Sequence, residues 1–141
     1  MTNTARRTPE DYVAIAIVTL AVTLIVSVVS CKPAQAQDGF ASYYTKASCK
    51  REGTSGVYTA SGEPYNEGAL TCALPWKPND RMWAVYGHRT GHTVFVRHND
   101  KGPGKGPQSK GVIIDLTPEA FKQVCGSLEQ GKCEVSIQGV I

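Results

Sequence analysis

Two apolar runs that each end in an aspartate, joined by a stiff basic loop, constrain this 141-residue chain more than any other feature. The alternating run at residues 93–98 (TVFVRH) leads into Asn99 and Asp100, and the run at residues 112–114 (VII) leads into Asp115. Between them, residues 101–111 hold four Gly, two Pro and three Lys. Short apolar runs of this kind are typical of β-strands. We therefore predict two strands that deliver carboxylates beside a cationic loop, an arrangement suited to a cleft for a polar, extended substrate.

Structural roles for the two acids stay open at this point, because aspartate opens turns and caps helices well. A helix signal follows Asp115 directly. It consists of an N-cap, a proline at the first helical position, an acid in the first turn and a terminal glycine, namely Thr117, Pro118, Glu119 and Gly126. We expect one short helix here, with an apolar face.

Other short runs carry strand signals, and the strongest of them forms a hairpin. Residues 81–86 (RMWAVY) and 93–98 flank a short loop bounded by glycine, which is typical of paired antiparallel strands. Further strand candidates are residues 39–45, 56–60, 69–74 and 133–137, whereas residues 46–55 and 75–80 have loop composition. Many short strands, one short helix and abundant glycine predict a mainly β fold, a small closed barrel in one domain at residues 37–141.

The first 36 residues differ in kind from the rest. Arg6 and Arg7 precede an uncharged apolar run at residues 12–30, and the segment AQA ends at Ala36, the layout of a secretory signal. The run is also long enough to serve as an uncleaved membrane anchor. A third option is lipidation, because residues 28–31 (VVSC) resemble a bacterial lipobox with Cys31 as the lipid-bearing residue. All three options predict export to the periplasm or cell envelope, with membrane contact only through this segment or a lipid on Cys31.

Four further cysteines, an even number, indicate two disulfides in a small exported domain. Three pairings are possible, and we expect the local one, Cys49–Cys72 with Cys125–Cys133. No two cysteines have the C-x2-C spacing of a zinc site, so we expect no metal and no cofactor. Residues 37–141 hold 12 Lys and Arg against 10 Asp and Glu, which is too even a balance to indicate nucleic acid as a partner. We expect a monomer.

Five segments appear in the order seen in the rare lipoprotein A family, which the chain resembles over nearly all of residues 37–141. They are residues 41–44 (ASYY), 59–65 (TASGEPY), 69–71 (ALT), 94–103 (VFVRHNDKGP) and 113–121 (IIDLTPEAF). The resemblance implies a six-stranded double-psi β-barrel and a lytic transglycosylase that cleaves the glycan strands of peptidoglycan. More distantly, the barrel is similar to those of expansins, barwin-like proteins and family 45 endoglucanases.

The resemblance also implies which acids act. An acid must protonate the leaving glycosidic oxygen, and in a lytic transglycosylase the sugar's own 6-hydroxyl then attacks the anomeric carbon. One carboxyl can therefore serve first as acid and then as base. By resemblance that carboxyl is Asp100, and Asp115 and Glu63 match other acidic positions of the barrel superfamily. To act as an acid near neutral pH, Asp100 would need a raised pKa. The positive charges of the nearby lysines would lower that pKa instead. Expected substrate contacts are Tyr44, Tyr65, Trp76, Arg97, His98 and Lys101.

One departure from the family pattern bears on catalysis. After Leu70 and Thr71 the family usually continues as A-A-H-x-T-L-P, whereas this chain reads TCALP at residues 71–75. The functional histidine of that motif is absent. His98 is the strongest substitute, because it lies two residues before Asp100 and should share its strand face.

The alternative function is a non-catalytic, expansin-like module that binds peptidoglycan or loosens the wall. Exposed aromatic side chains would then stack on sugar rings. Trp76, in a proline-flanked loop, is the better candidate for such a contact, whereas Trp83 is expected in the core.

Overall fold

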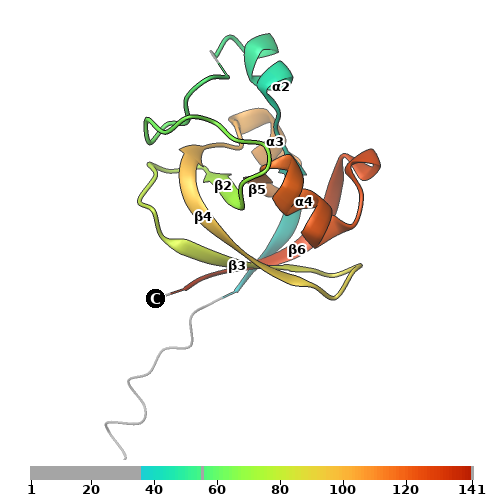
Figure 1. The fold of residues 1–141 in the computed structure, drawn as a ribbon. Coiled ribbons are helices and arrows are strands. Elements are labelled where there is room, and N and C mark those ends of the chain that lie inside the picture. Colours follow the sequence, from blue (N-terminus) through green and yellow to red (C-terminus); the bar gives the residue numbers. More distant parts are fainter. Residues whose placement is uncertain (1–35, 55, 141) are drawn as a thin grey trace, which may run out of the picture. The chain divides into compact units, whose positions relative to one another are not determined.

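Six strands close into a barrel in the computed structural model, which describes residues 36–54 and 56–140 (Figure 1). The strands are β1 (Gln37–Tyr43), β2 (Thr71–Leu74), β3 (Met82–Gly87), β4 (Thr93–Lys101), β5 (Val112–Leu116) and β6 (Lys132–Gly139). Around the barrel their order is β1-β5-β2-β4-β3-β6. The pairs β1/β5 and β2/β4 are parallel and the other four are antiparallel. The predicted mainly β barrel is confirmed, as is the hairpin, which is β3/β4.

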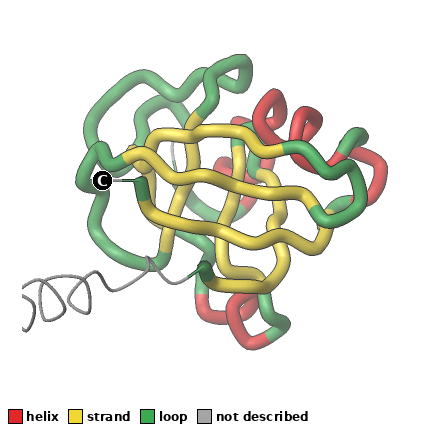
Figure 2. Tube along the Cα trace, turned by 90° about the horizontal axis from the view of Figure 1, so that it is seen from below, coloured by secondary structure: helices red, strands yellow, loops and turns green. Residues whose placement is uncertain are grey.

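The helices lie outside the strand wall (Figure 2) and outnumber the one that we predicted. They are α2 (Lys46–Arg51), α3 (Lys105–Ser109), α4 (Pro118–Cys125) and the 3-10 helix η1 (Leu128–Gln130). The loop prediction for residues 46–55 is wrong at residues 46–51, which form α2. Thr45 and Ser48 form a capping box at its start: each side chain accepts from the other's backbone N–H, at 3.1 and 2.8 Å. The strand prediction for residues 56–60 is also wrong, since only one isolated bridge forms there, between Tyr58 and Pro64.

Helix α4 begins and ends where the sequence predicts. Thr117 is its N-cap, Pro118 opens it, and Gly126 ends it with a φ of +88°, a backbone conformation that favours glycine. The Thr117 side chain does not cap the helix, however. Its hydroxyl donates to the backbone carbonyl groups of Ala69 and Thr71, which ties the start of α4 to β2.

The core fills the barrel with alternate residues of the strands. In β6, for example, Cys133, Val135 and Ile137 are buried while their neighbours are exposed or half-buried. Burying an aliphatic side chain of this size stabilises a fold by roughly 1.5–3 kcal/mol. Phe121 of α4 closes one side of the core against Tyr43, with ring centroids 5.0 Å apart.

A β-bulge in the β2/β4 pair decides which residues of β4 face outward. Cys72 pairs with His98, but the next residue of β2, Ala73, pairs with Asp100, so Asn99 is skipped. His98 therefore faces the barrel interior with Cys72, and both are fully buried. Asp100 lies on the outer face with Ala73. An extra residue of this kind reverses the normal alternation of a strand.

Of the two expected disulfides, one is present. Cys125 at the end of α4 is bonded to Cys133 in β6, as predicted. The predicted Cys49–Cys72 bond is wrong, and both residues are free thiols. Cys72 is part of the core cluster on β2, whereas Cys49 lies on α2 and outside that cluster.

The predicted signal, anchor and lipobox, with Cys31, fall almost entirely within residues 1–35, outside the described part of the chain. Within the described part, no helix combines the length and the hydrophobicity needed to cross a lipid bilayer.

Candidate active site

Asp100 and Asp115 lie on either side of Ala73, which is paired in register with both. The two acids are thus two strand spacings apart, roughly 10 Å between backbones. Both side chains line one pocket of about 370 Å³, here called the carboxylate pocket. The cleft predicted from the two strand ends is therefore present, on the outer face of the barrel.

The other walls of the carboxylate pocket come largely from the chain between β1 and β2. Figure 1 shows α2 and the following loop at the end of the barrel above β2 and β5. Their side chains in the pocket wall include Cys49, Glu52, Thr54, Tyr58 and Thr59. Sequence reasoning missed these residues because residues 46–55 were expected to be loop and residues 56–60 a strand. The Thr45/Ser48 pair was the signal that could have indicated the helix.

Asp115 has the most perturbed carboxyl group of the pocket. Its pKa is raised to about 6, chiefly by burial and further by the charges of Glu52 and Asp100. A hydrogen bond donated by the Ser42 hydroxyl to Oδ1 of Asp115 acts in the opposite direction. The result is a carboxyl group that carries a proton over a pH range in which an exposed aspartate would be ionised.

Asp100 is oriented by two backbone hydrogen bonds. Its Oδ1 accepts from the N–H of Ala60 and from the N–H of Lys101, both at 2.8 Å. The bond from Ala60 also attaches the loop after α2 to β4. Asp100 is therefore held in one orientation toward the pocket by the chain on both sides of it.

Two tyrosines that we predicted as substrate contacts line the pocket beside Asp100. The Tyr44 and Tyr65 rings lie 5.0 Å apart, and the Tyr65 hydroxyl donates to the Tyr44 carbonyl at 2.6 Å. Burial raises the pKa of both phenols, and the charge of Asp100 adds to the effect. Both hydroxyls therefore stay protonated at neutral pH and can donate hydrogen bonds.

At Gly102 the backbone lies close to the side chain of Asp115. A Cβ at this position would lie 3.0 Å from Oδ2 of Asp115 and 3.4 Å from the Cβ of Ala73. Gly104 and the expected contact Lys101 also line the pocket. Gly102 thus allows the chain to pass close to the buried carboxyl group of Asp115.

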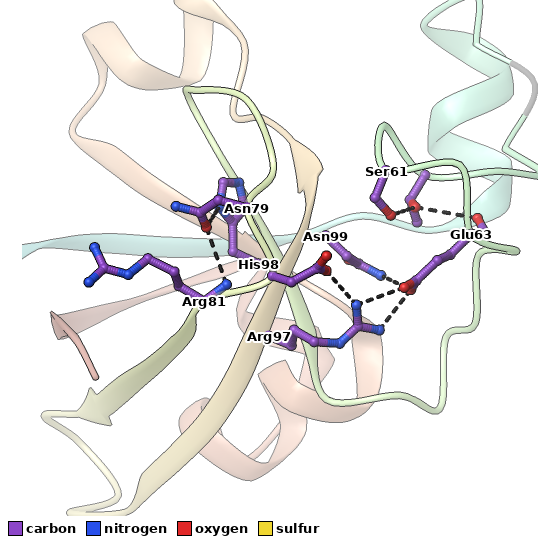
Figure 3. A network of polar contacts seen from close by, with 9 residues as sticks. Ser61, Glu63, Asn79, Arg81, Arg97, His98 and Asn99 are labelled. Carbon is purple, nitrogen blue, oxygen red and sulfur yellow. Dashed lines mark hydrogen bonds and ion pairs between the residues drawn. The ribbon is translucent and has the colours of Figure 1, made fainter. Parts of the chain in front are cut away.

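Glu63 lies outside the carboxylate pocket, in a separate polar network (Figure 3). Arg97 donates to both of its oxygens, at 2.7 and 2.8 Å, and Asn99 donates at 3.0 Å. These bonds lower the pKa of Glu63 to about 2. Arg97 also pairs with Asp80 at 2.7 Å. The structure therefore does not bring Glu63 or Arg97 to the two aspartates, and the network joins the turn at residues 59–63 to β4.

The histidine that we expected beside Asp100 is not there. His98 is fully buried, and its Nδ1 lies 3.1 Å from Oδ1 of Asn79 (Figure 3). The Trp76 ring stands edge-on to the His98 ring, with centroids 6.1 Å apart. Burial lowers its pKa. The expectation that His98 shares a strand face with Asp100 is wrong because of the bulge at Asn99. None of the described histidines lines the carboxylate pocket.

Trp76 and Trp83 lie together on the side of β4 that holds His98. Trp76 is 42% exposed, while Trp83 packs against the core cluster. Neither lines the carboxylate pocket. Within residues 36–54 and 56–140, no group of three or more His, Cys, Asp or Glu side chains is placed to hold a metal ion.

Comparison with known proteins agrees with this architecture. The curated endolytic peptidoglycan transglycosylase RlpA of Pasteurella multocida is 36% identical over 103 residues, which cover 73% of this chain and 31% of that protein. A probable endolytic peptidoglycan transglycosylase RlpA of a Nostoc species is 35% identical over 100 residues, 71% of this chain and 24% of the relative. The chain thus spans about a third or less of the length of these relatives.

Solved structures share the fold. The apo expansin of Clavibacter michiganensis matches with a TM-score of 0.55 and 20% identity over 76% of this chain and 51% of that one. The Streptomyces papain inhibitor matches with a TM-score of 0.54 and 24% identity over 76% and 96%. The family model described as lytic transglycolase matches residues 36–137. The barrel, its register and this match show that the chain belongs to the lytic transglycolase family of double-psi β-barrel proteins.

Proposed function

We propose that this protein is a lytic transglycosylase that cleaves the glycan strands of peptidoglycan and leaves anhydro-sugar ends. The observation that carries the proposal is the pair of aspartates in one pocket, of which Asp115 has a pKa of about 6. The family match and the peptidoglycan transglycosylases among the relatives support the same reaction.

We assign the proton donor to Asp115, in place of the assignment to Asp100 that the sequence favoured. A general acid is most effective when its pKa is close to the working pH. Asp115 meets this condition through burial, with the charges of Glu52 and Asp100 adding to it. In the proposed reaction the carboxyl proton moves to the glycosidic oxygen as its bond to the anomeric carbon breaks.

The second half of the reaction closes the new ring. The 6-hydroxyl of the same sugar attacks the anomeric carbon, and its proton goes to a carboxylate, so no water is consumed. Asp100 is the proposed electrostatic partner, because its oxygens face the pocket from the other side of Ala73. Tyr44, whose phenol stays protonated, is a proposed hydrogen-bond donor to the sugar.

The proposal includes the setting in which the enzyme works. We propose that the chain is exported to the cell envelope and acts there as a monomer on peptidoglycan. Contact with the membrane would come from the N-terminal segment or from a lipid on Cys31.

The test is mass spectrometry of the products released from purified sacculi. Asp115→Asn and Asp100→Asn should keep the shape of the site but lose anhydro-sugar products by about 100- to 10,000-fold. Asp38→Asn is the matched control, because Asp38 is an exposed acid on β1 that bonds Ser136 outside the pocket. Wild-type turnover in Asp115→Asn would exclude it as the proton donor.

A second candidate function is supported by one observation: none of the described histidines lines the carboxylate pocket. A barrel without a histidine at its acids can act as a glycan-binding module. In that case wild-type protein would be retained on sacculi without releasing any anhydro-sugar product, and Trp76→Ala would weaken retention.

A further inference from the structure

A row of five residues crosses five neighbouring strands on the outer face of the barrel. Strand pairing places them in register in the order Asp100, Ala73, Asp115, Ser42 and Lys132. Directly paired residues point to the same side of a sheet, and the buried residues beside them, such as Cys72 and Cys133, point inward. The row spans four strand spacings, roughly 19 Å. Asp115 is its midpoint.

A second pocket lies on the other side of this midpoint. It has a volume of about 500 Å³ and is lined by Ser42, Lys110 and Lys132, together with Gly106, Pro107, Val112, Gln130 and Gly131. We call it the lysine pocket. Ser42 lines the lysine pocket, Asp115 lines the carboxylate pocket, and the two residues are hydrogen-bonded to each other. The lysine pocket therefore begins one strand spacing, about 5 Å, from the proposed proton donor.

The described part of the chain does not neutralise the charge of the lysine pocket. Within the described part of the chain, both ion pairs are made by Arg97, so neither Lys110 nor Lys132 has a carboxylate partner there. The acids that flank the pocket in sequence, Glu129 and Glu134, do not line it. Nζ of Lys132 lies 4.6 Å from the centroid of the Phe40 ring, which orients the ammonium group and leaves its charge available. A concave site with uncompensated positive charge attracts anions.

We propose that the lysine pocket binds a carboxylate carried by the sugar next to the bond that is cleaved. This inference rests on the proposed function, and it names the part of the substrate that the enzyme selects. A peptidoglycan strand offers such a carboxylate either on the lactyl group of a strand without peptides or on the stem peptide of an intact strand. A neutral strand of N-acetylglucosamine offers none. The glycan would lie along the row, with its acidic group over Lys110 and Lys132.

The test compares binding of wild-type protein and lysine variants to soluble peptidoglycan strands and to the same strands after conversion of their carboxyl groups to amides. Lys110→Gln combined with Lys132→Gln should raise the Kd for unmodified strands about tenfold, as expected for two partly exposed ion pairs. On amidated strands the variant and the wild-type protein should bind equally weakly. Lys122→Gln, on α4 and away from the row, removes the same charge from an exposed site and serves as the control for Lys132→Gln.

Two further arms assign the source of the carboxylate. An effect of the lysine variants on strands stripped of peptides indicates the lactyl group, and an effect only on peptide-bearing strands indicates the stem peptide. Unchanged binding of the double variant to unmodified strands would overturn the inference. So would equal weakening on unmodified and amidated strands. Because binding is measured apart from cleavage, a protein that shows the lysine effect but releases no anhydro-sugar ends would refute the proposed reaction alone.

Discussion

Ser42 on β1 donates its hydroxyl hydrogen to Oδ1 of Asp115 on β5, although the two residues are 73 positions apart in the chain. The parallel register of β1 and β5 pairs them directly. Among the described residues, this bond is the one interaction at Asp115 that favours its ionised form, against burial and two like charges. Ser42 is therefore a positioning and tuning residue for the proposed proton donor.

Ser42→Ala should shift the pH profile of cleavage. Loss of the hydrogen bond raises the pKa of Asp115, so the protonated acid persists to higher pH and the falling limb of kcat/KM moves upward by about one pH unit. Ser136→Ala removes a hydroxyl that bonds Asp38 elsewhere on the barrel and serves as the control. If the falling limb of the kcat/KM profile does not move in Ser42→Ala, then ionisation of Asp115 does not cause that limb.

Asp115→Asn should change how stability depends on pH. Because its pKa is raised from 3.8 to about 6, the folded protein binds this proton more tightly than the unfolded chain. The resulting stabilisation is full below pH 4 and is lost as the pH rises through about 6. The unfolding free energy of wild-type protein relative to Asp115→Asn should therefore fall by on the order of 3 kcal/mol between pH 4 and pH 7. Urea unfolding of both proteins at several pH values measures this difference. Unfolding free energies that change with pH in the same way for wild type and Asp115→Asn would contradict the prediction.

Glu63→Gln should affect stability rather than chemistry. The pKa of Glu63 is lowered to about 2, so its ion pair stabilises the fold above pH 4.5 and the stabilisation is lost as the pH falls through about 2. We expect a lower Tm at pH 7, little difference from wild type near pH 2, and nearly unchanged turnover. Glu129→Gln, an exposed acid in η1, is the control. If Glu63→Gln loses most of its anhydro-sugar products while its Tm is unchanged, Glu63 takes part in catalysis and this prediction is wrong.

Peptide mapping without reduction should find Cys125 joined to Cys133, with Cys49 and Cys72 both alkylated as free thiols. Replacing Cys125 and Cys133 together by serine should cost roughly 2–3 kcal/mol, because the bond closes a short loop. Replacing Cys49 by serine should cost far less, since Cys49 is only half-buried on the largely exposed α2. Recovery of a peptide that joins Cys49 to Cys72 would contradict the structure.

Several features of this protein follow from local sequence chemistry. The β3/β4 hairpin follows from two strand-like runs around a loop bounded by Gly87 and Gly91, and the start of α4 follows from Thr117 and Pro118. The two aspartates could be placed at strand ends for the same reason. These signals act over a few residues, through backbone sterics and side-chain alternation. They can therefore be recognised in the sequence alone.

The site itself depended on contacts that no local pattern encodes. The register between β2 and β4 skips Asn99, which turns His98 into the core while Asp100 stays outside. Which acid keeps its proton is also a tertiary property, because desolvation depends on what covers a side chain and not on its neighbours in sequence. The sequence by itself determined the barrel, its hairpin and the presence of two strand-end acids. Only the tertiary structure decided that Asp115 is the buried one, that Ser42 bonds it, and that Glu63 pairs with Arg97 instead, because strand register and burial are set by residues far apart in the chain.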